Sequence, residues 1–313
     1  MPTNRPPWPC SHANAGAYYQ QEIETFNKKI IESDCIRDED GNPVILPKPV
    51  ITIKEGAWEI IQNIEPMVPV KWGQKSPYND NAPILSNGDH AAAGCVATAI
   101  AQVMAYHRYP LSYNWDALTQ YPYGGWLTPS AKAEIAQLFR TIGDNVYMQW
   151  GSQSGALVSD APDHFLKMGY SHTGIYQDYD LNSTIQSLSN RSPVIIRGSS
   201  QMTCLTYKRW IFFGEERKIC AVSGGGHAWV IDGVLNRRRK IDIYTDGILK
   251  NSYYEYERLV HCNWGWSGSS NGYYNSGVFN TKTGAIINTT KGAKNGTDGY
   301  YQYEIEILLN VKP

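Results

Sequence analysis

A cysteine, a histidine and an asparagine stand in this order along the chain, each in a local sequence that suits covalent catalysis. Cys95 follows Gly94 at the start of the helix-patterned segment 95–107. A helix N-terminus offers unpaired backbone N–H groups and the positive end of the helix dipole, which favour the nucleophilic thiolate. His227 follows three glycines at the entry of an apolar segment, and Asn263 opens a tryptophan-rich one. A thiol, a base and a group that orients the base are the parts of a nucleophilic hydrolase.

Each of these residues, taken alone, has a simpler explanation. A cysteine in an apolar helix is usually a small core residue, and a histidine beside a strand is more often a satisfied structural group. The sequence Asn263-Trp264-Gly265-Trp266 alone can be a turn followed by packed aromatic rings. It is rare by chance that a cysteine, a histidine and an asparagine each lie in such a local sequence and follow in this order. A motif is supported when its surroundings fit the proposed chemistry. The sequence therefore predicts a catalytic cysteine.

The segments around these residues resemble the streptopain family (peptidase family C10) of papain-like cysteine proteases. The resemblance is most specific around Cys95 and can be followed from about Glu65 to the C-terminus. It implies an α+β, papain-like two-lobed fold, with a helical lobe that carries the cysteine and an antiparallel β lobe that carries the histidine. The matching segments are Trp72–Gln74, Pro77–Asn79, His90–Ala99, Tyr106–Pro110, Gly226–Gly233, Asn263–Gly268 and Asn271–Tyr274.

The resemblance also implies roles for individual residues. Cys95 would attack the peptide carbonyl while His227 handles the proton, and the Gln74 side chain would join the Cys95 backbone N–H in an oxyanion hole. Asn263 would orient His227. Residues that line or shield the cleft would be Trp264, Trp266 and Gly226. No cofactor is expected, and no metal ion, because the chain has no C-x-x-C pair.

Two other function classes fit part of the pattern. One is a secreted binding or adhesion module on a papain-like scaffold, but inactive relatives usually lose the nucleophile or the histidine, and both Cys95 and His227 are present. The other is a transpeptidase or amidase that uses the same cysteine–histidine chemistry, which fold analogy alone does not exclude. We expect a cysteine endopeptidase that acts on proteins or peptides.

Composition narrows the partners of the protein. The 313 residues carry a net charge of −1, which gives no electrostatic footprint for nucleic acid. No apolar run is long enough to cross a bilayer. The N-terminus lacks the apolar stretch of a signal peptide, and because the family is exported, we expect a secreted or extracytoplasmic protein whose signal has been removed. Besides substrates, the expected partners are the protein's own propeptide or a dedicated inhibitor.

The cysteines other than Cys95 have no predicted catalytic role. Cys204 and Cys220 bracket an aromatic and charged insertion and are candidates for a disulfide. Cys262 is expected to be a buried free thiol. Cys10 and Cys35 lie in the N-terminal segment and remain unassigned.

The order of elements predicts the domains. Residues 1–64 form a leader, for which we expect the role of a short propeptide with an amphipathic helix; a stable extension is the alternative. Residues 65–313 form the catalytic domain, with a helical lobe at about 65–190 and a β lobe at about 191–313. Besides the helix of Cys95, we expect one helix that begins after Thr128 and two more at 163–168 and 181–189. The expected strands are 50–53, 194–196, 228–231, 240–244, 258–262, 272–274 and 303–308. The basic run 237–240 is interpreted as a solvated hairpin turn.

Overall fold

The computed structural model describes residues 49–208, 216–289 and 299–313. The described residues fall into two compact units. One contains residues 49–54 and Ile243–Asn251, and the other contains Glu55–Asp242 and Ser252–Pro313. The sequence predictions for the first part of the leader, including its amphipathic helix and its two cysteines, lie outside the described residues.

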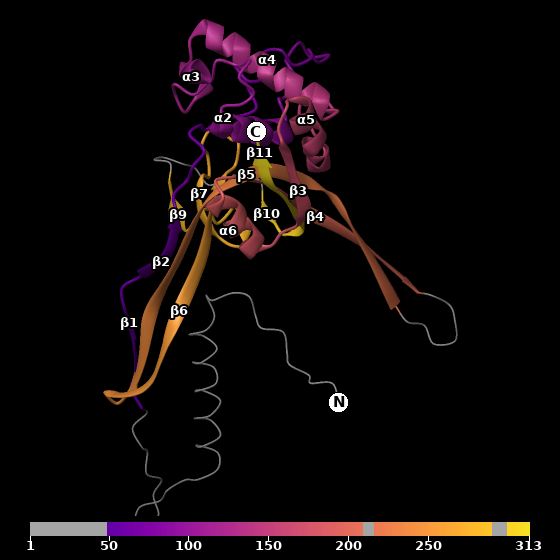
Figure 1. Cartoon of the computed structure of the whole chain (residues 1–313). Coiled ribbons are helices and arrows are strands. Elements are labelled where there is room, and N and C mark those ends of the chain that lie inside the picture. The colour runs from indigo at the N-terminus through magenta and orange to yellow at the C-terminus, as the bar shows by residue number, and fades with distance from the viewer. Residues whose placement is uncertain (1–48, 209–215, 290–298) are drawn as a thin grey trace, which may run out of the picture. The chain divides into compact units, whose positions relative to one another are not determined.

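Helices and strands follow in the order shown in Figure 1. The helices are α2 Cys95–His107, α3 Trp115–Leu118, α4 Pro129–Asn145, α5 Ala161–Lys167 and α6 Leu181–Ser189, with short 3-10 turns at Gly124–Trp126 and Val158–Asp160. The strands are β1 Ile51–Glu55, β2 Glu59–Ile64, β3 His172–Asp178, β4 Val194–Lys208, β5 Glu216–Thr245, β6 Ile248–Asn263, β7 Gly272–Asn275, β8 Phe279–Asn280, β9 Ile287–Asn288, β10 Tyr300–Tyr301 and β11 Tyr303–Lys312.

A nine-stranded sheet carries the β lobe. Its main order is β3-β11-β4-β5-β6-β7-β9, and β1 and β2 also pair with β5; β8 and β10 form a separate two-stranded sheet. The ladders of β4 with β5 and of β4 with β11 are antiparallel. The fold is therefore α+β, as predicted.

The two faces of the sheet are buried in two different hydrophobic clusters. Side chains alternate along a strand, so Ile195 and Val230 enter the cluster that contains α2 and α4, whereas Ile196 and Ile231 enter the cluster on the other face with Leu188 of α6. Figure 1 accordingly shows α2 to α5 gathered on one side of the sheet and α6 on the other. The helical layer thus holds the start of α2 against the strands β4 and β5.

Local sequence signals set the ends of the long helices. The Thr128 hydroxyl accepts a hydrogen bond from the Ala131 N–H (3.3 Å), and Pro129 occupies the first turn of α4, where its missing N–H costs nothing. Helix α2 ends at His107, and Arg108 adopts the left-handed conformation after it. The predicted helices 95–107 and 181–189 are confirmed.

Strand β3 lies in the part of the chain that was predicted to be helical, and it pairs with β11. None of its residues is buried, so the alternation that marks a half-buried strand is absent from the sequence. The predicted strands 228–231 and 240–244 are parts of the single strand β5.

The basic run 237–240 is not a hairpin turn, as had been predicted, but part of β5. Carboxylates on neighbouring strands pair with its guanidinium groups: Arg237 with Glu257 (2.6 Å) and Arg238 with Glu59 (3.0 Å). Cross-strand charge pairing of this kind lets a basic run remain extended within a sheet.

Helix α5 buries a histidine whose titration should make the protein sensitive to acid. The His164 ring is fully buried, and Asn145 Nδ2 lies 3.2 Å from its Nδ1. Burial lowers the pKa of His164 to about 4, and nearby Lys167 adds to this shift. A histidine in an unfolded chain titrates near 6.5, so between these values the unfolded chain binds a proton that the folded chain excludes.

We therefore expect the free energy of unfolding to fall as the pH drops from about 6.5 to about 4. His164 should account for a loss on the order of 3 kcal/mol. Urea unfolding of the wild type and of His164→Gln at pH 7 and near pH 4 measures this. The variant should lose less stability on acidification than the wild type. Equal losses in the two proteins would show that His164 is not a source of the acid sensitivity.

Candidate active site

Cys95 occupies the first position of α2, as predicted. The preceding residue, Gly94, has a φ of 88°, and a Cβ atom there would lie 2.7 Å from the Met148 Cε. Only glycine combines this left-handed backbone with so close an approach. The glycine therefore allows the chain to enter the helix with Cys95 at its N-terminal end.

The Cys95 thiol lies against the strand that carries His227. Cys95 packs against the hydrophobic cluster that contains Ala228, the residue after His227, and the backbone N–H groups of Ala228, Val96 and Cys95 itself lower the pKa of the thiol. Two segments that are distant in the sequence, the start of α2 and the centre of β5, thus meet at the thiol.

The Cys95 thiol is partly exposed, yet the loss of surrounding water has the largest effect on its pKa. Desolvation raises the pKa of Cys95 above its ordinary value, and the N–H groups of Ala228, Val96 and Cys95 oppose the rise only in part. The amides at the helix start favour the thiolate, as expected, but the loss of water outweighs them and the net shift of the Cys95 pKa is upward. A thiolate at neutral pH needs a further positive charge beside it.

The imidazole of His227 is oriented by a main-chain carbonyl. His227 Nε2 donates a hydrogen bond to the Trp264 carbonyl oxygen (2.9 Å), and the ring is buried. Because a carbonyl can only accept, Nε2 must carry a proton, which makes Nδ1 the nitrogen that gains or loses the second proton.

Asn263, predicted to orient His227, makes side-chain hydrogen bonds to two other residues. Its Nδ2 donates to the Val70 carbonyl (2.8 Å), and its Oδ1 accepts from Asn271 Nδ2 (3.1 Å). Asn271 Oδ1 in turn accepts the Trp264 N–H (3.0 Å). The Asn263 side chain is therefore linked to the Trp264 peptide, whose carbonyl holds the ring, through Asn271.

Both predicted shielding tryptophans lie against the imidazole. The ring centroid of Trp266 is 4.5 Å from that of His227, and that of Trp264 is 5.9 Å away with nearly parallel planes. Trp264 is fully buried. The two indoles limit access of water to the hydrogen bond between His227 and the Trp264 carbonyl.

Gln74 lies in a loop that is tied to the start of α2. Its backbone carbonyl accepts a hydrogen bond from the Ala93 N–H (2.9 Å), two residues before Cys95. The Thr98 hydroxyl reaches the carbonyl oxygens of Gly94 (2.9 Å) and of Gly73 (3.4 Å), the neighbour of Gln74. These bonds fix the loop of Gln74 beside the helix that carries the thiol.

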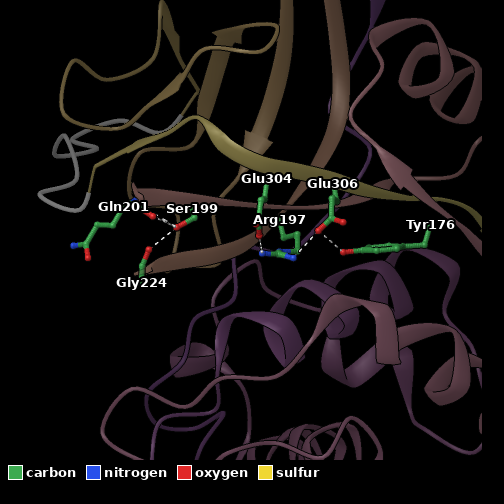
Figure 2. A network of polar contacts seen from close by, with 7 residues as sticks. All are labelled: Tyr176, Arg197, Ser199, Gln201, Gly224, Glu304 and Glu306. Carbon is green, nitrogen blue, oxygen red and sulfur yellow. Dashed lines mark hydrogen bonds and ion pairs between the residues drawn. The ribbon is translucent and has the colours of Figure 1, made fainter. Parts of the chain in front are cut away.

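The glycine-rich segment before His227 is held by two serines that the sequence analysis missed. Figure 2 shows the Ser199 hydroxyl directed at the Gly224 carbonyl, and the Ser200 hydroxyl donates to the Gly225 carbonyl (3.2 Å). Gly226 lies opposite Ser199 in the ladder of β4 and β5 and is exposed. Only the register of the two strands identifies these serines as partners of the segment.

His261 belongs to a separate polar cluster. Its Nδ1 pairs with Asp232 Oδ1 (2.5 Å), and its Nε2 lies 2.8 Å from Thr289 Oγ1. Asp232 also accepts the Val68 N–H (3.0 Å). The two ring nitrogens thus join β6 to β5 and to Thr289, just after β9, and Asp232 adds the link to the segment near Val68.

The remaining cysteines agree with their predicted states as far as they are described. Cys262 is a buried free thiol. Cys204 is disulfide-bonded, and it lies directly opposite Cys220 in the ladder of β4 and β5. Within residues 49–208, 216–289 and 299–313, no group of three or more His, Cys, Asp or Glu side chains is arranged to hold a metal ion. No helix in these ranges has the length and apolar character needed to span a membrane.

Comparison with known proteins identifies the family. The model of the peptidase C10 family matches residues 72–112 and 111–274, which is more than half of the chain. Streptopain of Streptococcus pyogenes serotype M1 is 26% identical over 292 residues, which cover 78% of this chain and 61% of streptopain. The thiol protease/hemagglutinin PrtT of Porphyromonas gingivalis is 22% identical, over 78% of this chain and 26% of that protein. The chain spans about three fifths of the length of the streptopains it matches.

Solved structures agree on the fold. Active wild-type interpain A, a cysteine protease of Prevotella intermedia, superposes with a TM-score of 0.52 at 22% identity, over 79% of this chain and 94% of that one. A mutant prointerpain A fragment from the same organism covers 97% of this chain and 85% of its own, with a TM-score of 0.50 and 19% identity. The fold is that of a papain-like cysteine peptidase. The chain belongs to the peptidase C10 family.

Proposed function

We propose that this protein is a cysteine endopeptidase in which Cys95 and His227 act as a thiolate–imidazolium pair on peptide bonds of protein substrates. The observation that carries the proposal is the meeting of the two segments: Cys95, at the start of α2, packs against the same cluster as Ala228, the residue after His227 on β5. The proposal is also supported by the proton on His227 Nε2, which the Trp264 carbonyl holds in place.

The chemistry would proceed in two steps. The Cys95 sulfur attacks the carbonyl carbon of the substrate, and His227 Nδ1–H passes its proton to the leaving amine, which leaves a thioester on Cys95. Water, deprotonated by His227, then attacks the thioester and releases the acid and the free thiol. The burial that raises the pKa of Cys95 makes the positive imidazolium necessary for the thiolate at neutral pH.

The oxyanion formed in each step needs hydrogen-bond donors at the place where charge develops. The backbone N–H of Cys95 is one candidate. Because the loop that carries Gln74 is hydrogen-bonded to the residues just before Cys95, its side-chain amide is proposed as the other. Asn263 is proposed as a positioning residue that acts through the Trp264 peptide, and Trp264, Trp266 and Gly226 as lining and shielding residues.

No specific observation favours the alternatives, a binding module or a transpeptidase. The proposed domains are a leader at 1–64, with propeptide function, and a catalytic domain at 65–313. The proposed location is outside the cytoplasm, which is supported by the disulfide bond at Cys204, since such bonds persist in oxidising compartments.

Alkylation of the thiol tests the ion pair directly. In the wild type, iodoacetamide should label Cys95 rapidly near pH 6, because the His227 imidazolium keeps the sulfur ionised. In His227→Ala the positive charge is gone and burial alone acts, so the labelling rate should rise only above about pH 8.5, the ordinary thiol value. Rates are measured by mass spectrometry across the pH range.

Cys262 serves as an internal control, since burial raises its pKa strongly and it should stay unlabelled in the folded protein. Rapid labelling of Cys95 in His227→Ala near pH 6 would refute the ion pair. Equal, slow labelling in both proteins at that pH would refute it as well.

A further inference from the structure

A charged cluster lies on β4, β11 and β3, outside the groups used in the proposed mechanism. Figure 2 shows the Arg197 guanidinium between two carboxylates of β11. Its Nη1 donates to Glu306 Oε2 (2.5 Å), and its Nη2 lies 3.3 Å from Glu304 Oε2. The Tyr176 hydroxyl donates to the same oxygen of Glu306 (2.7 Å).

The strand register places this cluster next to the Cys95 thiol. Arg197 is the direct partner of Ala228, which follows His227 and lies in the cluster against which Cys95 packs, and Glu306 is the direct partner of Arg197 on the next strand. Directly opposed residues share one face of a sheet at a spacing of about 5 Å. That face also carries Ile195, which packs against the helical layer that holds Cys95. The row Ala228–Arg197–Glu306 therefore runs sideways from the thiol.

A substrate can reach the charged cluster, because the cluster is partly exposed to solvent. The side chains of Arg197 and Glu306 are 27% and 25% exposed, and that of Glu304 is 52% exposed. Glu304 stands in a bulge of β11 with a φ of 45°, a left-handed conformation that is unusual for glutamate. Such strain is often found at functional sites. Here the strained residue is Glu304, whose carboxylate pairs with an Arg197 guanidinium that already pairs with Glu306.

The cluster has an excess of negative charge. One guanidinium faces the two carboxylates of Glu304 and Glu306, and Asp178 lies directly opposite Glu306 on β3. Burial, reinforced by the hydrogen bond to Glu306, raises the pKa of Tyr176 to about 12, so its phenol stays neutral at neutral pH. Glu304 has the longer contact with Arg197 (3.3 Å) and is more exposed than Arg197 or Glu306, so of the two carboxylates paired with Arg197 it is the one that an incoming cation would meet.

We propose that Glu304, held in place by Arg197 and backed by Glu306, is a specificity-determining residue that favours substrates with a lysine or arginine side chain beside the scissile bond. This inference rests on the proposed peptidase function, since it concerns the substrates of the same site. The row Ala228–Arg197–Glu306 extends from the site in one direction only, so the preference should occur at a single substrate position.

The test uses peptides that differ in one charge. In a neutral peptide that the enzyme cleaves, lysine and acetyl-lysine are placed in turn at the positions flanking the scissile bond. These side chains are similar in shape, and only lysine is charged. At one position the ratio of kcat/KM for lysine over acetyl-lysine should be about fivefold, and about 0.5 M salt should reduce it.

The Glu304→Gln variant should bring this ratio close to one. Glu59→Gln is the matched control: the Glu59 side chain is 58% exposed, close to the 52% of Glu304, and it pairs with Arg238 elsewhere in the same sheet. It should leave the ratio unchanged. A ratio near one at every position in the wild type, or a ratio that Glu304→Gln leaves intact, would overturn the inference.

A binding measurement separates this inference from the proposed function. The Cys95→Ala protein cannot turn over substrate, and its Kd for the two peptides should still differ in favour of lysine. If the wild type hydrolysed no peptide while this difference remained and depended on Glu304, the peptidase function would fail and charge recognition would stand. Equal Kd values for the two peptides would refute charge recognition.

Discussion

Replacing Cys95 with alanine should abolish peptide hydrolysis, lowering kcat/KM by roughly a factor of 10⁴ or more, while the protein stays folded. Among the described cysteines, only Cys95 combines a helix start, contact with the strand of His227 and partial exposure. Hydrolysis of a fluorogenic peptide and thermal unfolding of the variant provide the two measurements. The same variant should resist self-processing, whereas the wild type should shorten with time if residues 1–64 act as a propeptide.

Two other cysteines provide the controls for this result. Cys262→Ala and Cys204→Ala should lose activity only in proportion to any loss of folded protein, since Cys262 is a buried thiol and Cys204 is held in a disulfide bond. Elimination of activity by either substitution in a folded protein would contradict the assignment of one nucleophile. A wild-type chain that stays intact and is fully active from the first measurement would show that the leader is structural.

Replacing Asn271 with alanine should lower kcat by roughly tenfold to a hundredfold with little change in KM. Its side chain holds the Trp264 N–H and the Asn263 amide, so its loss frees the peptide whose carbonyl orients His227. A small misplacement of a catalytic group has costs of this order. The limb of the pH–rate profile that reports His227 should shift as well, which a purely structural role would not cause.

Asn263→Ala provides the comparison for Asn271→Ala. If the Trp264 carbonyl is the acceptor, the two substitutions act through the same peptide and should have similar effects that do not add in the double variant. If the Asn263 side chain contacted His227 itself during catalysis, Asn263→Ala would be much the more damaging of the two.

Local signals made much of the fold predictable. The helices α2, α4 and α6 have clear starts or ends in the sequence: Gly94 before Cys95, Thr128-Pro129, and Asp180, whose side chain accepts the Ser183 N–H. Strands β2 and β3 could not be found in this way, because none of their residues is buried and their place is set by partners distant in sequence. The same holds for the basic run of β5, since the carboxylates that pair with it lie on other strands.

The parts of the candidate site that are side chains could be predicted from the sequence, whereas the parts that are main-chain groups could not. Cys95 and His227 have distinctive local sequences, and the structure brings their segments together. The Ala228 N–H at the thiol and the Trp264 carbonyl at the imidazole have no sequence signal, because every residue except proline has both groups. Because a side chain leaves a sequence signal and a carbonyl does not, the side chain of Asn263 was expected to orient the His227 ring. The raised pKa of Cys95 was also missed, since burial is a property of the packed molecule.

The acceptor that orients His227 is a backbone carbonyl, and this affects how the protein tolerates genetic change. Any amino acid at position 264 would supply the same oxygen, so drift at this position cannot delete the contact itself. An alanine scan would therefore assign the contact no energy, even though the imidazole depends on it. Selection should act instead on the residues that fix the direction of the peptide, namely Asn271, Asn263 and Gly265, whose φ of 71° and close approach to Thr98 leave no room for a larger residue.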